Sequence, residues 1–390
     1  GEITCADENH MILLGYLTFF DAPKKSAKEA IKKLRDLEVR TKILTGDRKD
    51  VALSVCQRVG VNCSRILTGQ EIENLEESQL QTAVEYGEVF AELTPNQKVE
   101  IIQVLRENGH TVGFLGDGLN DVPAICEADV GISVDTAVDA AKDAADVVLL
   151  DKDLNVLEEG ILEGRKTFIN MSKYIRITAS SNFGNIFSIV CASAFLPFLP
   201  MTAIQLLLLS LLYATLYIVL PWDVGESEEY RKPREWSGKT LGRVMRCFGP
   251  FSSALDILTF LCLYCFLCPS VCGGVTFEGL SDPAMIARYI TVFQTGWFLE
   301  SMWSQILILQ MLRTAKIPFI QSRPSKSVVI ITALGVVVFS GITMLPLGTI
   351  LGLTTLPAGY FVFLFVVVLV YMFLTNRIKR RYVKQYHELI

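Results

Sequence analysis

The sequence predicts an α/β domain built on a doubly wound parallel sheet, followed by an all-α domain of six membrane-spanning helices. Up to about residue 173, short apolar runs alternate with charged amphipathic stretches, as in soluble α/β proteins. After Tyr174, long apolar runs dominate, and the whole chain reaches 51% hydrophobic residues, which is too high for a purely soluble protein. We therefore expect a first domain at residues 1–165 and a second at 166–390.

The first domain contains candidate strands at residues 11–17, 41–45, 88–93, 111–115 and 129–134. Helical patterns separate them, such as those at residues 24–38 and 95–108. Because the strands are nearly continuous in apolar residues and alternate with helices, they are expected to pair in parallel. Ligands of such sheets bind beyond the carboxyl ends of the strands, so motifs at those ends are candidate sites.

Two motifs after strands carry groups suited to phosphate. "KILTGD" ends in Thr45, Gly46 and Asp47, whose hydroxyl and closely spaced backbone N–H groups can hold phosphoryl oxygens. In "LTPNQK", Pro95 opens a helix and Lys98 adds a positive charge within its first turn. Each motif alone also fits a structural role, as a turn with an N-cap aspartate or as a solvated helix lysine.

A third motif, "GDGLND", carries groups suited to a metal. Asp117, Asn120 and Asp121 supply oxygen ligands, and Mg²⁺ prefers oxygen and tends to share it with substrate phosphate. Asp121 alone is also a plausible cap before "VPAI". Because the three motifs occur in this order, each after a strand, the sequence favours a combined phosphate and magnesium site.

The second domain contains six apolar runs close to the ~20 residues that cross a bilayer as a helix, at about 174–199, 201–221, 248–268, 290–312, 328–347 and 357–375. Lysine and arginine gather in the connections 222–247 and 313–327 and in the tail, whereas the alternate connections contain only Arg288. By the positive-inside rule, the soluble domain and both chain ends lie on the cytoplasmic side.

Charge and cysteine patterns exclude or weaken other classes. The net charge is −5, and no basic patch interleaved with aromatic residues indicates nucleic-acid binding. Cys262, Cys265, Cys268 and Cys272 match an iron–sulfur spacing, but they lie at the end of an apolar run, where cysteine often acts as a small hydrophobic residue. We expect plain membrane cysteines; an iron–sulfur cluster and a Cys268–Cys272 disulfide on the outer face are the alternatives.

The combined motifs resemble the phosphorylation domain of P-type ATPases, which has a haloacid-dehalogenase-like fold. "FFDAPKKS", "KILTGD", "LTPNQK" and "GFLGDGLNDVPAICEADVGISV" carry this resemblance, which continues into the membrane domain. "TASSNFGNIFSIVCASAFLPFLPM", "FGPFSSALDILTF" and "FQTGWFLESMWSQ" make it strongest to the bacterial magnesium-transporting P-type ATPases. The resemblance implies an ATP-driven pump that imports Mg²⁺ across the plasma membrane, the bacterial inner membrane, through an aspartyl-phosphate cycle.

The resemblance also implies roles for single residues. The phosphoryl group would be bound by the catalytic residues Thr45, Gly46, Asp47 and Lys98. Catalytic Mg²⁺ would be held by Asp117, with Asn120 and Asp121 organising the same site. Asp21, in "DAPK", would lie at the hinge toward the nucleotide domain, although Ala22 departs from the family's usual Asp-Pro-Pro pattern.

Parts of the family pattern are missing from these residues. The Asp-Lys-Thr-Gly-Thr stretch with the nucleophilic aspartate, the actuator domain, most of the nucleotide domain and the first four spans do not occur. The chain therefore resembles the carboxyl-terminal half of a pump, with the missing amino-terminal half as its expected partner. Without the nucleophile, these residues alone are expected to form no phosphoenzyme.

Polar groups within the spans are candidates for the transported ion, because burying them in a membrane is costly. Asn182 and Asn185 in the first span, Asp256 and Glu300 are such groups, with helix packing as the alternative for the amides and structural pairing for the acids. Ala214 stands where magnesium pumps carry an aspartate. This departure keeps open a pump for Ca²⁺, H⁺ or a monovalent cation. A catalytically inactive truncated membrane protein remains the alternative from another class.

Overall fold

The computed structural model describes residues 12, 14, 15, 26–61, 63–151, 153–219, 223 and 230–386. The chain forms two compact units, with the boundary between Leu162 and Glu163, inside one long helix. The predicted strand at 11–17 lies largely outside the described residues, and Asp21 lies wholly outside them.

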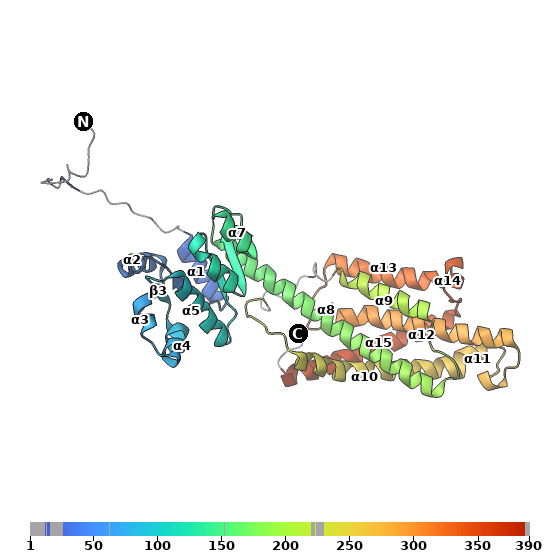
Figure 1. Cartoon of the computed structure of the whole chain (residues 1–390). Coiled ribbons are helices and arrows are strands. Elements are labelled where there is room, and N and C mark those ends of the chain that lie inside the picture. The colour runs from blue at the N-terminus through green and yellow to red at the C-terminus, as the bar shows by residue number, and fades with distance from the viewer. Residues whose placement is uncertain are drawn as a thin grey trace. The chain divides into compact units, whose positions relative to one another are not determined.

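The strands of the first unit form two parallel sheets (Figure 1). The first sheet has the order β1-β3-β2 and the second β4-β5-β6, with every pair parallel. The strands are β1 (Ile43–Leu44), β2 (Ile66–Thr68), β3 (Val89–Ala91), β4 (Gly113–Leu115), β5 (Val130–Val134) and β6 (Val147–Leu149). The parallel pairing is confirmed, but the described strands form two three-stranded sheets where the sequence predicted one, and β2 and β6 are strands that the sequence did not predict.

Seven α-helices accompany these strands in the described part of the first unit: α1 (Ala27–Asp36), α2 (Lys49–Val59), α3 (Gly69–Glu73), α4 (Glu77–Tyr86), α5 (Pro95–Glu107), α6 (Val122–Glu127) and α7 (Asp139–Ala144). The apolar positions of α1 follow helical spacing, so Ala27, Ala30 and Leu34 are buried together. Val89 and Phe90 of β3 are fully buried, because helices cover both faces of a parallel sheet.

The second unit is helical at all six predicted apolar runs. Its helices are the latter part of α8 (Asn155–Phe195), α9 (Ala203–Tyr217), α10 (Gly238–Cys262), α11 (Cys268–Val271), α12 (Pro283–Leu312), α13 (Lys326–Ile342), α14 (Pro346–Ile350) and α15 (Ala358–Tyr386), with a π-helical turn at Leu263–Leu267. Helix α12 is buried along most of its length and contacts α9, α10, α13 and α15.

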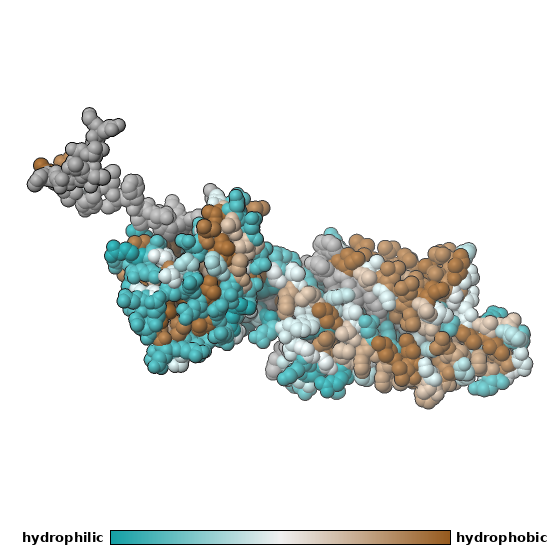
Figure 2. Space-filling model, in the orientation of Figure 1, coloured by the Kyte–Doolittle hydropathy of each residue, from teal (hydrophilic) through white to brown (hydrophobic). Residues whose placement is uncertain are grey.

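Among the described residues, two continuous helical segments are long and apolar enough to cross a membrane, Gly238–Val271 and Ala358–Tyr386, and α13 and most of α9 are shorter apolar helices. Figure 2 shows hydrophobic residues over much of the visible face of these helices, whereas the α/β unit is mostly hydrophilic on its visible face. This distribution agrees with a soluble unit and a membrane unit.

The four cysteines of the predicted pattern are free thiols: Cys262, Cys265, Cys268 and Cys272. Cys265 is exposed while Cys268 and Cys272 are buried, since the helical turns point them in different directions. In the part of the chain that the structure describes, no group of three His, Cys, Asp or Glu side chains could hold a metal ion. The alternatives of an iron–sulfur cluster and a Cys268–Cys272 disulfide therefore gain no support.

Candidate phosphate and magnesium site

The "TGD" loop follows β1 at the carboxyl end of the first sheet. Thr45 Oγ1 donates to Asp47 Oδ2 at 3.0 Å and accepts the Asp47 amide at 3.1 Å, which closes the turn. The amides of Glu92 and Leu93, just after β3, donate to the carbonyls of Asp47 at 2.9 Å and Thr45 at 3.1 Å. These bonds fix the loop to the neighbouring strand and leave Gly46 and Asp47 exposed.

Lys98 lies in the first turn of α5, and local sequence explains why the helix begins there. Thr94 is the N-cap, Pro95 occupies the first helical position, and Gln97 completes a capping box with Thr94. From this turn, Lys98 Nζ donates to Asp121 Oδ1 at 2.7 Å. The two side chains are 11% and 16% exposed, so the ion pair is largely shielded from water. The structure thus joins "LTPNQK" to "GDGLND".

The "GDG" loop is fixed by bonds to the next strand. The Gly116 amide donates to the Ile132 carbonyl at 3.0 Å, and the fully buried Ser133 donates through Oγ to the Gly116 carbonyl at 2.9 Å. A Cβ atom at Gly116 would lie 2.6 Å from Cβ of Asp121, so glycine is needed for this close approach. Sequence reasoning missed Ser133, since nothing in "GISV" marks a serine that holds another loop.

The donor set at this loop fits Mg²⁺. Asp117 and Asn120 are exposed, while Asp121 is half-buried beside Lys98. Two carboxylates and an amide oxygen suit an ion that keeps several waters and takes further oxygens from phosphate. In the described part of the chain, no hydrogen bond or ion pair links Thr45 to Asp117 or Asp121, so the "TGD" loop is not joined to these carboxylates.

A second polar cluster is buried among the helices of the second unit. Asp256 of α10 accepts bonds from Ser188 Oγ of α8 at 2.5 Å and from Trp297 Nε1 of α12 at 3.2 Å. The carboxyl group of Glu300, one turn after Trp297, lies beside that of Asp256. Glu300 is 2% exposed, and its Oε2 has no hydrogen-bond partner. The cluster therefore holds two carboxyl groups and an unsatisfied oxygen.

The two predicted amides of α8 are separated. Asn185 is buried and accepts from Gln305 Nε2 of α12 at 3.0 Å, whereas Asn182 is exposed. Sequence reasoning missed Ser188 and Gln305, although Ser188 follows Asn185 by three residues and so lies on a neighbouring part of the same helix face.

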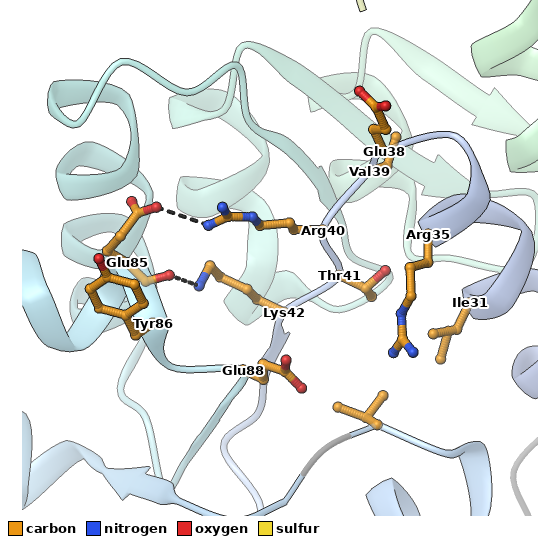
Figure 3. A pocket seen from close by; sticks show the side chains of 11 residues that line it. Ile31, Arg35, Glu38, Val39, Arg40, Thr41, Lys42, Glu85, Tyr86 and Glu88 are labelled. Atoms are coloured by element: carbon orange, nitrogen blue, oxygen red, sulfur yellow. Dashed lines mark hydrogen bonds and ion pairs between the residues drawn. The ribbon is translucent and has the colours of Figure 1, made fainter. Parts of the chain in front are cut away.

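A pocket of about 550 Å³ lies at the amino ends of β1 and β3, opposite the strand ends that carry the three motifs (Figure 3). Lys42 Nζ donates there to the carbonyls of Val84, Glu85 and Gly87 at 2.7, 3.0 and 2.5 Å, and Arg40 pairs with Glu85 at 2.9 Å. These cations complete the end of α4. The pocket is lined by Ile31, Arg35, Glu38, Val39, Arg40, Thr41, Lys42, Val61, Glu85, Tyr86 and Glu88.

Comparisons with known proteins agree with the geometry. Residues 3–129 match the family model described as haloacid dehalogenase-like hydrolase, and residues 198–381 match that described as cation transporting ATPase, C-terminus. The chain is 47% identical over 385 residues to a protein of Salmonella typhimurium named magnesium-transporting ATPase, P-type 1, covering 98% of this chain and 41% of the relative. The Escherichia coli protein of the same name is 44% identical over 386 residues, covering 99% and 41%.

More distant relatives have names that refer to another ion. The calcium-transporting ATPase of Bacillus subtilis is 32% identical over 266 residues, covering 66% of this chain and 30% of the relative. The chain spans 41% of the length of the magnesium-transporting relatives, so it matches part of each of them. Together with the paired motifs of the first unit, these matches show that the chain belongs to the P-type cation-transporting ATPases, of which it carries the carboxyl-terminal part.

Proposed function

We propose that this chain is part of an ATP-driven P-type pump that imports Mg²⁺ across the plasma membrane. Residues 1–165 would form the phosphorylation domain and residues 166–390 a domain of six spans, with both chain ends in the cytoplasm. The observation that carries the proposal is the shielded Lys98–Asp121 ion pair, 2.7 Å long, between two motifs that follow parallel strands. The similarity to the magnesium-transporting ATPases of Salmonella typhimurium and Escherichia coli supports the choice of ion.

In this proposal, the first unit supplies the electrostatic side of a phosphoryl-transfer site. Lys98 offsets the negative charge on the transferred group, and Thr45 and Gly46 offer a hydroxyl and a backbone N–H to its oxygens. Asp117 and Asp121, with Asn120, hold Mg²⁺, which when bound offsets charge on the phosphate oxygens. The attacking aspartate comes from a part of the pump outside these 390 residues.

A magnesium titration of the whole chain in detergent, followed by calorimetry, tests this site. Asp117→Asn removes an exposed carboxylate ligand and is expected to weaken binding at least about tenfold. Lys98→Met removes the cation that competes for Asp121 and is expected to tighten binding. An affinity that is the same in the wild type and the Asp117→Asn variant would show that this loop is not the magnesium site.

The buried cluster of the second unit is the proposed binding site for the transported ion. Asp256 and Glu300 place two carboxyl groups together out of water, and Glu300 Oε2 is an oxygen that a cation would satisfy. Asn185 adds an amide oxygen on α8, whereas Asn182 is exposed and lies outside this buried cluster.

The same titration separates this ion site from the catalytic site. Asp256→Asn and Glu300→Gln are expected to remove one class of Mg²⁺ binding and to leave the class that depends on Asp117. Adding Ca²⁺ as a competitor for the binding site at Asp256 and Glu300 decides between a magnesium pump and a calcium pump, a choice that Ala214 leaves open. A chain that binds no divalent cation in either unit would instead fit an inactive membrane protein.

A further inference from the structure

Gln97, the residue before Lys98, has a set of hydrogen bonds that exceeds the needs of a helix cap. It is 6% exposed. Its Oε1 accepts the Thr94 amide at 2.9 Å, which completes the capping box. Its Nε2 donates to the Gly69 carbonyl at 3.1 Å and to Glu73 Oε1 at 2.9 Å. The amide group therefore ties the first turn of α5 to α3, whose first residue, Gly69, is 28 residues away in sequence.

The segment that leads into α3 repeats the sequence of the proposed phosphate loop. Leu67-Thr68-Gly69 has the same order as Leu44-Thr45-Gly46, and it spans the end of β2 and the first residue of α3. The Thr68 hydroxyl accepts the Glu71 amide as the cap of α3, whereas the Thr45 hydroxyl is bonded to Asp47 within its own turn. A Cβ atom at residue 69 would lie 2.6 Å from Gln97 Oε1 and 2.7 Å from the Glu92 carbonyl, so only glycine permits this contact.

We propose that Gln97 is a positioning residue for Lys98. By fastening the first turn of α5 to α3, it keeps the Lys98 ammonium against Asp121 at the phosphate site. The first turn of a helix frays readily, and a lysine side chain has high rotamer entropy, so a fixed ammonium needs such support. This inference rests on the proposed function, because a fixed Lys98 matters to the reaction only if that ammonium serves a phosphoryl group.

Gln97→Glu separates the tie from the cap. Glutamate at this position still accepts the Thr94 amide and is a preferred capping-box residue, but its carboxylate cannot donate to the Gly69 carbonyl. The probe is acetic anhydride, applied to the whole chain in detergent without Mg²⁺, with acetylation of each lysine quantified by mass spectrometry. Loss of the tie is expected to raise the reactivity of Lys98 about fivefold, the effect of about one hydrogen bond.

The matched control is Gln79→Glu, the same change at the same position of the capping box of α4, where the glutamine is exposed. Lys42, whose ammonium donates to three backbone carbonyls, reports loss of the fold, so a purely structural effect would raise both lysines together. If Gln97→Glu unfolds the unit, Gln97→Ala removes the tie without a buried charge, and Gln79→Ala is then the control because both variants lose the capping-box bond. Equal Lys98 reactivity in the wild type, the Gln97 variant and the control would overturn the inference. Because the assay contains no Mg²⁺, its failure is distinct from a failure of the magnesium titration.

Discussion

Glu85 shows how one carboxylate can fasten several segments of the first unit. It accepts bonds from His110 Nε2 at 2.7 Å, Arg40 Nη1 at 2.9 Å and Asn108 Nδ2 at 3.4 Å. The hydrogen bond from His110 has the largest effect and, with the His110 charge and the weaker effects of the Arg40 and Asn108 hydrogen bonds, it outweighs burial and holds the pKa of Glu85 below its ordinary value of 4.5. A carboxyl group with a lowered folded-state pKa stabilises the fold above its unfolded-state pKa, and this stabilisation is lost as the pH falls through the folded-state value.

Glu85→Gln is therefore expected to lower the stability of the first unit at pH 7 by about 0.5–1 kcal/mol, the range for partly exposed pairs, and to flatten its dependence on pH below about 5. Thermal unfolding between pH 4 and 7 measures both effects. Glu77→Gln, an exposed change in the same helix, is the control. Parallel pH profiles for wild type and Glu85→Gln would contradict this role.

The residues predicted from sequence and those missed differ in where their partners lie. Lys98 and Asp121 were predicted because the chemistry of each is visible in its own motif. The structure adds their 2.7 Å contact. Gln97 and Ser133 were missed because their partners, Gly69 and Gly116, belong to other segments. A single sequence contains no local signal for such contacts, which arise only when the parallel strands bring their ends together.

At the scale of helices, the end of α12 is held by a buried ion pair. Arg313 Nη1 lies 3.0 Å from Asp223 Oδ2, with the side chains 1% and 4% exposed, and Nη2 donates to the Ser322 carbonyl at 2.6 Å. Asp223 Oδ1 also accepts the amide of Ser325, the N-cap of α13, at 3.1 Å. One aspartate thus joins the ends of two helices.

Asp223→Ala is expected to destabilise the second unit by about 3–5 kcal/mol, because it leaves the Arg313 guanidinium buried without its counter-charge. The double variant Asp223→Ala with Arg313→Met removes both charges and is expected to recover much of this loss. Thermal unfolding of the chain in detergent measures the three proteins. A double variant no more stable than Asp223→Ala would show that the pair contributes through something other than charge.

Apolar run length predicted the helices well but not their interruptions. The run at 328–347 is divided into α13 and α14, with Pro346 at the first position of the second helix. The run at 248–268 ends in a π-helical turn before Pro269. A proline offers no N–H group and disturbs the preceding helical bonds, and the Tyr264 carbonyl in this turn accepts the Tyr289 hydroxyl at 2.5 Å. Hydropathy averages over such local effects.

For the whole chain, composition predicted a soluble unit and a helical unit because 51% of residues are apolar and the apolar runs are confined to the second half. The structure confirms the parallel sheets and the helices, and it provides two helical segments of membrane-spanning length among the described residues. The membrane crossings of the other helices and the side on which each connection lies depend on charge distribution, and these remain proposals.

Cysteine labelling tests the proposed orientation. Cys126 is an exposed native thiol in the first unit, and Ser281 is an exposed residue in the connection between α11 and α12. If the basic connections face the cytoplasm, these positions lie on opposite sides of the membrane. In spheroplasts of a bacterium that produces the chain, a membrane-impermeant maleimide should label a Ser281→Cys variant at residue 281 and leave Cys126 unlabelled. Labelling of the parent chain, which lacks a cysteine at residue 281, is subtracted to correct for the other thiols.

After the membrane is permeabilised, both positions should react, which shows that Cys126 had been shielded by the bilayer rather than by the fold. Labelling of Cys126 alone in intact spheroplasts would reverse the topology, and labelling of both would mean that the number of spans between them is even.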